Sequence, residues 1–344
     1  MAAAARFGIV VLPDTLDGFG ALCKDVEDNG FDWLGVADSQ SVFRELYVSL
    51  TVAALNTTRI RIGPLVTNPL TRHPVVSASA ISSVDELSGG RVVLGLGSGD
   101  SAIYTLGTAP ATLAGLEEAV VMLQHLTSGD AIDRDGKRWR VHRSSRRVPV
   151  YLAAEGPRTL ELAGRVADGV IVGLGLTPEV IRLSLAAIER GARVAGRRLS
   201  DIDVWWFAKS NVADTREAAV APIAMALAAS ANHAFRFTLD GKGVPPALHE
   251  RIKGLQKEYD AHHHEIAGGG NASLVDRFGL GDFLLDRFAI AGTPDDCATQ
   301  IRRAMAAGAH QFMITAFVPD PRAFIIRWMR EVVTTVTSQS EARP

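Results

Sequence analysis

The sequence has few of the residues that build disulfide-rich or metal-binding domains. Only two cysteines occur in 344 residues, Cys23 and Cys297, and neither has a partner at a CxxC spacing. We therefore interpret both as free thiols buried in a protein of the reducing cytoplasm. The run His262–His264 does not predict a metal site, because consecutive residues of a helix point in different directions and one ion cannot bind all three.

The sequence also lacks an excess of one charge and a long apolar run. Lys and Arg number 36 against 38 Asp and Glu, which leaves a net charge of −2. Nothing in this balance draws the chain to nucleic acid or to an anionic membrane. The five Trp and four Tyr are too scattered for a base-stacking platform. The opening MAAAARFGIVVL has one arginine and a short apolar run, so we expect neither a signal peptide nor a membrane span there.

The sequence does have a regular alternation of apolar runs with helical periodicity. Parallel strands buried on both faces and joined by crossover helices build α/β proteins. Eight runs are predicted as strands: Phe7–Leu12, Phe31–Val36, Arg59–Val66, Arg91–Leu96, Val148–Ala153, Gly169–Val172, Ile202–Phe207 and Gln311–Ala316. They predict a single (β/α)₈ TIM-barrel domain over residues 1–337, with residues 338–344 as a tail. An open doubly wound sheet is the alternative, weakened because no GxGxxG opens the first helix.

The alternation is interrupted once, between the seventh and eighth predicted strands. Residues 230–285 hold helical patches such as Pro246–His264 and the glycine run Gly268–Gly270. We interpret this stretch as a long helical insertion. Long segments of this kind inside barrels are often lids, so we expect it to be mobile when no ligand is bound.

Small and polar residues follow the predicted strands at their carboxyl ends. Asp38-Ser39 follows the second strand, Thr67-Asn68 the third and Gly97–Asp100 the fourth. Barrel enzymes build their active sites from the loops at this end of the strands. We therefore expect these side chains to meet in one site, with the Asp100 carboxylate able to hydrogen-bond a ligand or orient a substrate.

Four segments carry a resemblance to a known family. They are VTNPLTRHP (Val66–Pro74), SGGRVVLGLGSGD (Ser88–Asp100), AAEGPRTLELAGRVADGV (Ala153–Val170) and AGTPDDCATQIRRAMAAGA (Ala291–Ala309). The chain resembles the bacterial-luciferase-like superfamily of flavin- and deazaflavin-dependent oxidoreductases, and most of all its methylenetetrahydromethanopterin-reductase branch. The resemblance extends from about Phe7 to Phe317. It implies an oxidoreductase that binds FMN or coenzyme F420 at the carboxyl ends of the barrel strands.

The resemblance also implies which residues bind the cofactor. The segment Ala154, Glu155, Gly156 and Pro157, with Gly173 after the next strand, matches the family's phosphate-binding loop. A helix N-terminus suits this role because its N–H groups and dipole attract anions. Glu155 replaces a glycine of some relatives, so its carboxylate must point away from the phosphate or contact another part of the cofactor.

Further cofactor contacts are implied at the ends of the third and fourth strands. Leu65, Val66, Thr67 and Asn68 match a family bulge that often contains a non-prolyl cis peptide and supports the cofactor ring from behind. Ser98 and Gly99 follow the fourth strand, beside Asp100. On the seventh strand, one of Trp205 and Trp206 points inward, where it could form a wall of the substrate pocket.

Asp38, Ser39 and Asp100 are the candidate catalytic residues. Where this chain has Asp38-Ser39, many relatives have Asp-His, and that histidine exchanges protons in several deazaflavin enzymes. Ser39 therefore favours an FMNH₂-dependent two-component monooxygenase, which would take reduced FMN from a separate reductase and use O₂ on a small organic substrate. The first alternative is an F420-dependent reductase or dehydrogenase, and the second is a flavin-binding protein without catalysis. In each case we expect a homodimer or a higher homo-oligomer.

Overall fold

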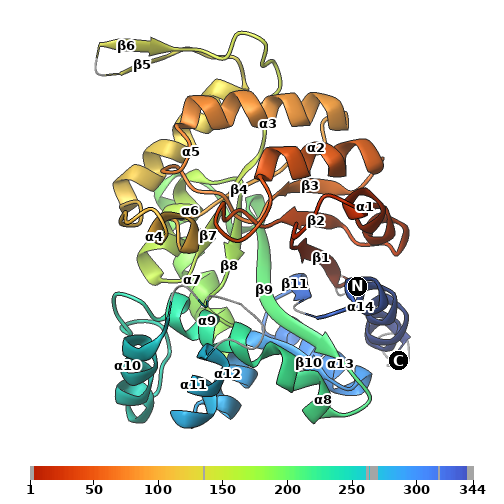
Figure 1. Ribbon diagram of the computed structural model, residues 1–344. Coiled ribbons are helices and arrows are strands. Elements are labelled where there is room, and N and C mark those ends of the chain that lie inside the picture. Colours follow the sequence, from red (N-terminus) through yellow and green to blue (C-terminus); the bar gives the residue numbers. More distant parts are fainter. Residues whose placement is uncertain (1–3, 135, 261–262, 264–269, 317, 339–344) are drawn as a thin grey trace.

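The computed structural model describes residues 4–134, 136–260, 263, 270–316 and 318–338. Eight parallel strands form a barrel in the order β3-β2-β1-β11-β9-β8-β7-β4 (Figure 1). Their bounds are β1 Arg6–Val11, β2 Trp33–Val36, β3 Arg61–Pro64, β4 Leu94–Leu96, β7 Val150–Ala154, β8 Gly169–Val172, β9 Asp203–Val212 and β11 Gln311–Ala316. The predicted (β/α)₈ fold is confirmed.

The barrel closes where β3 meets β4. Only two isolated parallel bridges join these strands, one between Ile62 and Val92 and one between Thr67 and Leu96. The backbones approach closely at this seam, because a Cβ on Gly63 would lie 1.8 Å from the carbonyl oxygen of Val93. Likewise, a Cβ on Gly95 would lie 2.4 Å from the carbonyl oxygen of Pro64. Glycine at both positions is therefore required for closure.

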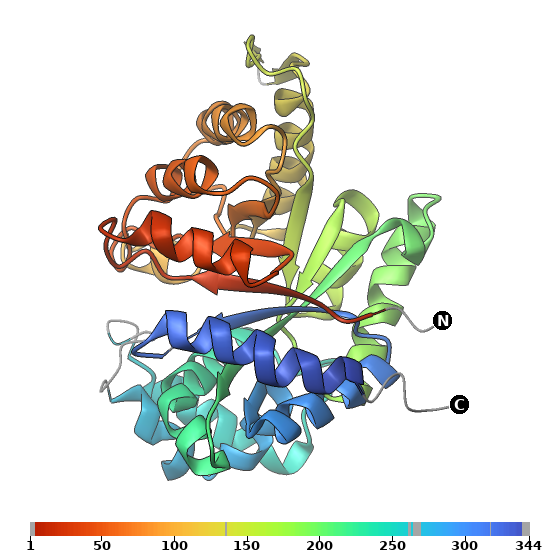
Figure 2. The ribbon, with the colours of Figure 1, turned by 90° about the vertical axis from the view of Figure 1, so that its right-hand side faces the viewer.

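Helices cover the outside of the barrel (Figures 1 and 2). They are α1 Phe19–Asp28, α2 Leu46–Asn56, α3 Pro74–Ser88, α5 Leu113–Thr127, α6 Pro157–Val166, α7 Pro178–Val194, α13 Pro294–Ala306, α14 Pro321–Arg327 and α15 Thr334–Ser338, with a π-helical stretch Trp328–Val333 before α15. The short helix α4 Ser101–Tyr104 lies instead beside the cavity described below. Sequence signals set several starts, since the hydroxyls of Thr112, Thr177 and Thr293 cap α5, α7 and α13. No helix in the described part of the chain is long and apolar enough to cross a membrane.

Two layers of apolar side chains pack on either side of the barrel wall. Inside the barrel, the ring of Trp33 contacts those of Tyr151 and Trp205 at centroid distances of 5.4 and 5.3 Å. Between the strands and the helices, a larger cluster includes Trp206 and both cysteines, Cys23 and Cys297. Burial raises the pKa of each thiol to about 12, so the cysteines are inert core residues.

The chain between β9 and the last barrel strand builds a separate helical layer. Its elements are α8 Arg216–Val220, α9 Ala224–Ala234, α10 His249–Glu258, α11 Asn271–Arg277, α12 Gly281–Phe288 and the short strand β10 Ala289–Gly292, which pairs with the end of β9. Helix α9 packs against α10, α11 and α12, and these helices share their own apolar cluster. The predicted insertion, residues 230–285, begins within α9 and so covers only the later part of this helical layer. Gly268, Gly269, His262 and His264 lie outside the described residues, as does the tail from residue 339.

A two-stranded hairpin projects from the molecule next to α3 and α5 (Figure 1). It consists of β5 Ile132–Arg134 and β6 Lys137–Trp139, which pair antiparallel. The hairpin lies between α5 and β7 in the chain, and its described side chains line none of the cavity discussed below.

Candidate active site

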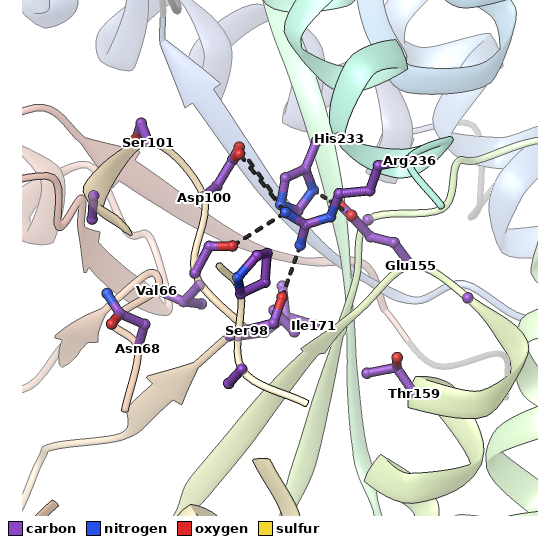
Figure 3. A pocket seen from close by; sticks show the side chains of 18 of the residues that line it. Val66, Asn68, Ser98, Asp100, Ser101, Glu155, Thr159, Ile171, His233 and Arg236 are labelled. Carbon is purple, nitrogen blue, oxygen red and sulfur yellow. Dashed lines mark hydrogen bonds and ion pairs between the residues drawn. The ribbon is translucent and has the colours of Figure 1, made fainter. Parts of the chain in front are cut away.

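One cavity of about 690 Å³ lies at the carboxyl ends of the barrel strands. Its walls come from the loops after β2, β3, β4, β7 and β8, and from α9 and the segment that follows it (Figure 3). The predicted residues that line it are Asp38, Ser39, Leu65, Val66, Thr67, Asn68, Ser98, Gly99, Asp100, Glu155, Gly156, Pro157 and Gly173. The structure thus gathers every candidate catalytic residue and almost every candidate cofactor residue around a single space.

Three predicted residues are not in the cavity wall. Ala154 ends β7 and is 1% exposed, so it supports the loop without lining the cavity. The expectation that Trp205 or Trp206 walls the pocket is wrong. Trp205 does point into the barrel, but it is fully buried against Trp33, and its Nε1 donates a hydrogen bond of 3.1 Å to Asp203. Asp203 is the first residue of β9, so this indole lies at the amino end of the barrel, away from the cavity.

The bulge after β3 has the predicted cis peptide, between Leu65 and Val66. Gly95 on β4 makes room for it, since a Cβ there would lie 3.0 Å from Cγ1 of Val66. The side chain of Asn68 fixes the chain beyond the bulge, because its Oδ1 accepts hydrogen bonds from the N–H groups of Leu70 and Thr71 at 3.0 and 2.9 Å. The bulge therefore presents Val66 to the cavity on a well-supported loop.

Asp38 is held by two hydrogen-bonding side chains. Its Oδ2 accepts a hydrogen bond of 2.6 Å from the Thr67 hydroxyl and one of 2.8 Å from Nη1 of Arg72. The Asp38 side chain is 3% exposed. Because the guanidinium neutralises this carboxylate and the neighbours occupy its lone pairs, the geometry suits it to positioning the loops after β2 and β3.

Ser39 is buried beside a second hydroxyl. The Oγ of Ser101, at the start of α4, donates a hydrogen bond of 3.0 Å to the Oγ of Ser39. Gln40 adds another link between the same two loops, since its Nε2 donates to the carbonyl oxygen of Ala102 at 2.6 Å. These contacts join the loop after β2 to α4 and form one side of the cavity.

The N-terminus of α6 opens directly into the cavity. Gly156 is its N-cap and provides no capping side chain, and Pro157 occupies the first turn. The next two residues, Arg158 and Thr159, also line the cavity. An uncapped helix start with a guanidinium and a hydroxyl beside it has the donors and charge that bind a phosphate group.

Lys242 adds a buried ammonium group to the same wall. Its Nζ donates hydrogen bonds to the carbonyl oxygens of Ala234, at 2.7 Å, and Arg236, at 3.1 Å, which lie at the end of α9 and just beyond it. The residue is only 5% exposed. Burial lowers the pKa of Lys242 to about 8, although the nearby Glu155 carboxylate acts in the opposite direction.

Arg287 of α12 fixes the loops around this ammonium group. It is 1% exposed and donates to three carbonyl oxygens, those of Leu174, Lys242 and Gly243. Its guanidinium also lies 5.0 Å from the ring centroid of Phe235. Burial lowers the pKa of Arg287 to about 10. Because Leu174 follows Gly173, this one side chain ties two loops of the cavity together.

The carboxylate of Glu155 is paired across the cavity. It forms an ion pair with Nδ1 of His233, near the end of α9. Gly173 leaves the space for this side chain, because a Cβ there would lie 2.6 Å from Oε1 of Glu155. The carboxylate is thus directed toward a histidine of the helical layer.

Several polar cavity residues were not predicted from the sequence, among them Arg158, Thr159, Lys209, His233, Arg236 and Lys242. Nη2 of Arg236 donates a hydrogen bond of 2.8 Å to the Ser98 hydroxyl, and Nη1 donates one of 3.1 Å to the carbonyl oxygen of Gly99 (Figure 3). The sequence does hold a local signal, because His233 and Arg236 are basic residues in the otherwise mostly apolar and small stretch MALAASANHAFRF (Met225–Phe237).

A parallel barrel with a cavity at its carboxyl ends, lined by an apolar bulge and an uncapped helix start, has the architecture of a barrel enzyme. Comparison with known proteins identifies its family. The chain belongs to the luciferase-like monooxygenase family, which matches residues 3–311. The resemblance found in the sequence is therefore confirmed.

Two reductases are similar to the chain in sequence and a third protein is similar in fold. The chain is 32% identical to the 5,10-methylenetetrahydromethanopterin reductase of Methanolobus tindarius, over 89% of this chain and 93% of that protein. It is 28% identical to the coenzyme F420-dependent tetrahydromethanopterin reductase of Methanopyrus kandleri, whose structure superposes with a TM-score of 0.77 over 97% of this chain and 100% of that one. The FMN-bound oxygenating component of 3,6-diketocamphane monooxygenase from Pseudomonas putida shares the fold, with 17% identity and a TM-score of 0.66 over 97% and 99% of the two chains.

Proposed function

We propose that this oxidoreductase uses coenzyme F420 and transfers a hydride between it and a small organic substrate, as a reductase or a dehydrogenase. The observation that carries the proposal is the full-length similarity to reductases, one of them F420-dependent. The FMN enzyme is similar in fold alone. The relatives therefore favour the F420 alternative over the FMNH₂-dependent monooxygenase toward which Ser39 pointed.

The cavity has the donors that a phosphorylated, carboxylated cofactor needs. The start of α6, with Arg158 and Thr159, provides N–H groups, a guanidinium and a hydroxyl, and Lys242 adds a second cation. The apolar bulge at Val66 provides a surface for a flat ring. The deazaflavin of F420, when bound, would accept or donate the hydride. The residues present therefore fit this cofactor.

The chain's own residues would bind, orient and shield the ligands. Asp38 and Arg72 hold the loops after β2 and β3 in fixed positions. Arg236 ties the segment after α9 to the loop after β4, which closes one side of the cavity. Such pre-formed walls exclude water and lower the cost of ordering the ligands. The substrate is proposed only as a small organic molecule, and the active form as a homo-oligomer.

One observation supports a second candidate function. Ser39 cannot exchange a proton at neutral pH without a base of its own. This favours an FMNH₂-dependent monooxygenase, for which a separate flavin reductase and O₂ would be the partners.

Titration of the purified protein with F420, FMN and FMNH₂, followed by absorbance and fluorescence quenching, tests the proposal. We expect F420 to bind at least tenfold more tightly than FMN in either redox state. Binding of FMNH₂ without F420 would support the monooxygenase instead. Tight flavin binding with no oxidation or reduction of any substrate would indicate a binding protein.

A further inference from the structure

A histidine of the helical layer lies between two carboxylates in the cavity. The Nδ1 of His233 is paired with Glu155, from the loop after β7, and its Nε2 lies 3.6 Å from Oδ2 of Asp100, from the loop after β4 (Figure 3). The side chain is 27% exposed, and the cavity is the space it borders. Three distant segments of the chain thus meet at one imidazole.

The two ring nitrogens are in different situations. Glu155 lies within hydrogen-bond reach of Nδ1, so it would hold a proton there and orient the ring. The distance of 3.6 Å from Nε2 to Asp100 exceeds that of a hydrogen bond. Nε2 can therefore still meet a ligand atom. An imidazole that one carboxylate orients through Nδ1, and whose Nε2 has a longer ion-pair contact of 3.6 Å, is suited to proton transfer.

Charged groups from several elements surround this imidazole. Asp100 and Glu155 provide negative charge. Arg236 and Lys242, on the segment after α9, and Lys209 of β9, which also lines the cavity, provide positive charge. Arg236 lies 3.8 Å from Asp100 and so compensates part of its charge. Both negative and positive charges therefore lie around the imidazole of His233.

The geometry points to His233 as the residue that exchanges the proton accompanying hydride transfer, with Glu155 as its positioning residue. This inference rests on the proposed F420-dependent function. In the reducing direction the substrate carbon gains a hydride, and the Nε2–H bond breaks as its proton bonds to the substrate heteroatom. The imidazole then takes a proton from solvent. The solvent in turn receives the proton that is released when the cofactor is oxidised. The substrate is reduced, the cofactor is oxidised, and no other reactant is needed.

The candidates at the end of β2 are less suited to this role. Asp38 is neutralised by Arg72, and Ser39 is a buried hydroxyl paired with another hydroxyl. His233 reaches the same cavity from α9. The chain therefore has a proton-exchanging histidine, although it comes from the helical layer and not from the second strand.

Two measurements test the inference. The first is long-range ¹H–¹⁵N NMR of the ¹⁵N-histidine-labelled protein without cofactor. We expect the neutral ring of His233 to carry its proton on Nδ1 in the wild type and on Nε2 in E155A, because free imidazole side chains prefer the Nε2–H tautomer. An Nε2–H tautomer in the wild type, or no change in E155A, would overturn the assignment whatever the cofactor proves to be.

The second measurement compares H233N with H125N, the same substitution at a histidine of α5 that also lies near a carboxylate, Asp130, outside the cavity. Oxidation of F420H₂ is followed with the small ketone, aldehyde or imine that the wild type reduces fastest. We expect H233N to lose about 100-fold in kcat, to bind F420 within about threefold of wild type, and to lose the pH dependence of kcat. H125N should match the wild type.

The outcomes separate the two proposals. An H233N rate within fivefold of wild type, with the pH dependence intact, would overturn the role of His233 and leave the F420-dependent function standing. If the wild type bound no F420 and reduced none of the small ketones, aldehydes and imines tested, the proposed function would fail. The NMR result would still show whether Glu155 sets the tautomer of His233.

Discussion

Arg72 forms a bidentate hydrogen bond with Asp38, in which Nη1 lies 2.8 Å from Oδ2 and Nη2 lies 3.3 Å from Oδ1. Nη2 of the same guanidinium also donates to Glu45, the N-cap of α2, at 2.8 Å. Asp38 thus belongs to a structural ion-pair network that joins the loop after β2 to the start of α2. The charge of this carboxylate is compensated within the network and positions the two loops, which leaves acid–base chemistry to other groups in the cavity.

The first prediction contrasts the two sides of the cavity. Ser39→Ala should lower turnover by less than tenfold, or about 1.4 kcal/mol in activation free energy, because it removes one hydroxyl–hydroxyl contact. Asp100→Asn should cost more, since it removes a charge next to His233 and Arg236. Steady-state F420H₂ oxidation checks both variants. If S39A lost all turnover while D100N kept the wild-type rate, Ser39 and not Asp100 would be the more important residue for catalysis.

The second prediction concerns the start of α6. Gly156 has an extended backbone with φ −147°, so other residues fit its conformation, and a Cβ there would lie 3.5 Å from Cε of Lys242. Gly156→Val would fill the approach to the helix N-terminus. We expect F420 binding to weaken by about tenfold or more with an unchanged melting temperature, and G156A as the control should retain most of the affinity. Unchanged affinity in G156V would remove this loop from the cofactor site.

The third prediction concerns stability below neutral pH. Burial alone would raise the pKa of Glu27, but the N–H groups of Arg59, Ile60 and Thr58 outweigh it and lower this pKa to about 2. A carboxyl with a lowered folded-state pKa stabilises the fold above its unfolded-state pKa of 4.5, and the contribution is lost as the pH falls from there toward 2. Glu27→Gln should therefore cost about 2 kcal/mol at pH 7.

Denaturant unfolding of E27Q and the wild type at pH 7 and pH 3 measures this contribution. The difference in unfolding free energy between E27Q and the wild type should be smaller at pH 3 than at pH 7. An equal difference at both pH values would show that the charge of Glu27 contributes nothing to stability. Lys24→Gln, on the exposed face of α1, is the control and should unfold like the wild type at both values.

The fourth prediction concerns Arg287. Arg287→Met leaves three carbonyl oxygens without their donor, those of Leu174, Lys242 and Gly243. We expect a loss of about 3 kcal/mol in unfolding free energy and weaker F420 binding, because the loops at Gly173 and Lys242 lose their common support. Chemical denaturation and the fluorescence titration measure the two effects. If R287M is destabilised but binds F420 as tightly as the wild type, the loops keep their shape without the Arg287 side chain.

The fifth prediction concerns self-association. Helix α2 has no charged residue, and it packs against α3. The two helices expose apolar side chains, among them Leu55 at 66% and Leu87 at 53%. A helix that is apolar on all sides is normally buried, so we expect a second copy of the chain to cover these helices. Sedimentation should show a dimer that the double variant L55E/L87E dissociates; a monomeric wild type would contradict this.

Much of the barrel could be predicted because apolar runs of strand length end at glycine or polar residues. The predicted Gly169–Val172 and Gln311–Ala316 coincide with β8 and β11. The seventh strand was predicted too short. Lys209, Ser210 and Asn211 are polar and suggested a strand end, yet all three are buried in the second half of β9. Pairing with β10 and β11 extends that strand, and single-sequence polarity does not show such tertiary pairing.

The site was predictable where motifs are local and not where packing brings distant segments together. Asp100 and Glu155 follow strands, so strand order alone places them at one end of the barrel. His233 and Arg236 enter the cavity because α9 packs over the strand ends, and no spacing in the sequence shows that contact. Trp205 was misplaced for a related reason, since pointing inward does not decide which end of the barrel a side chain occupies.

The seam between β3 and β4 also limits how this scaffold could be redesigned for new substrates. Gly63 and Gly95 face backbone carbonyl oxygens across the seam, and any side chain at either position would collide with the opposite strand. A mutagenesis library should keep both glycine codons fixed and randomise cavity positions away from the seam. Val42, Phe43 and Phe237 are such positions. Variation there would reshape the pocket while the barrel remains closed.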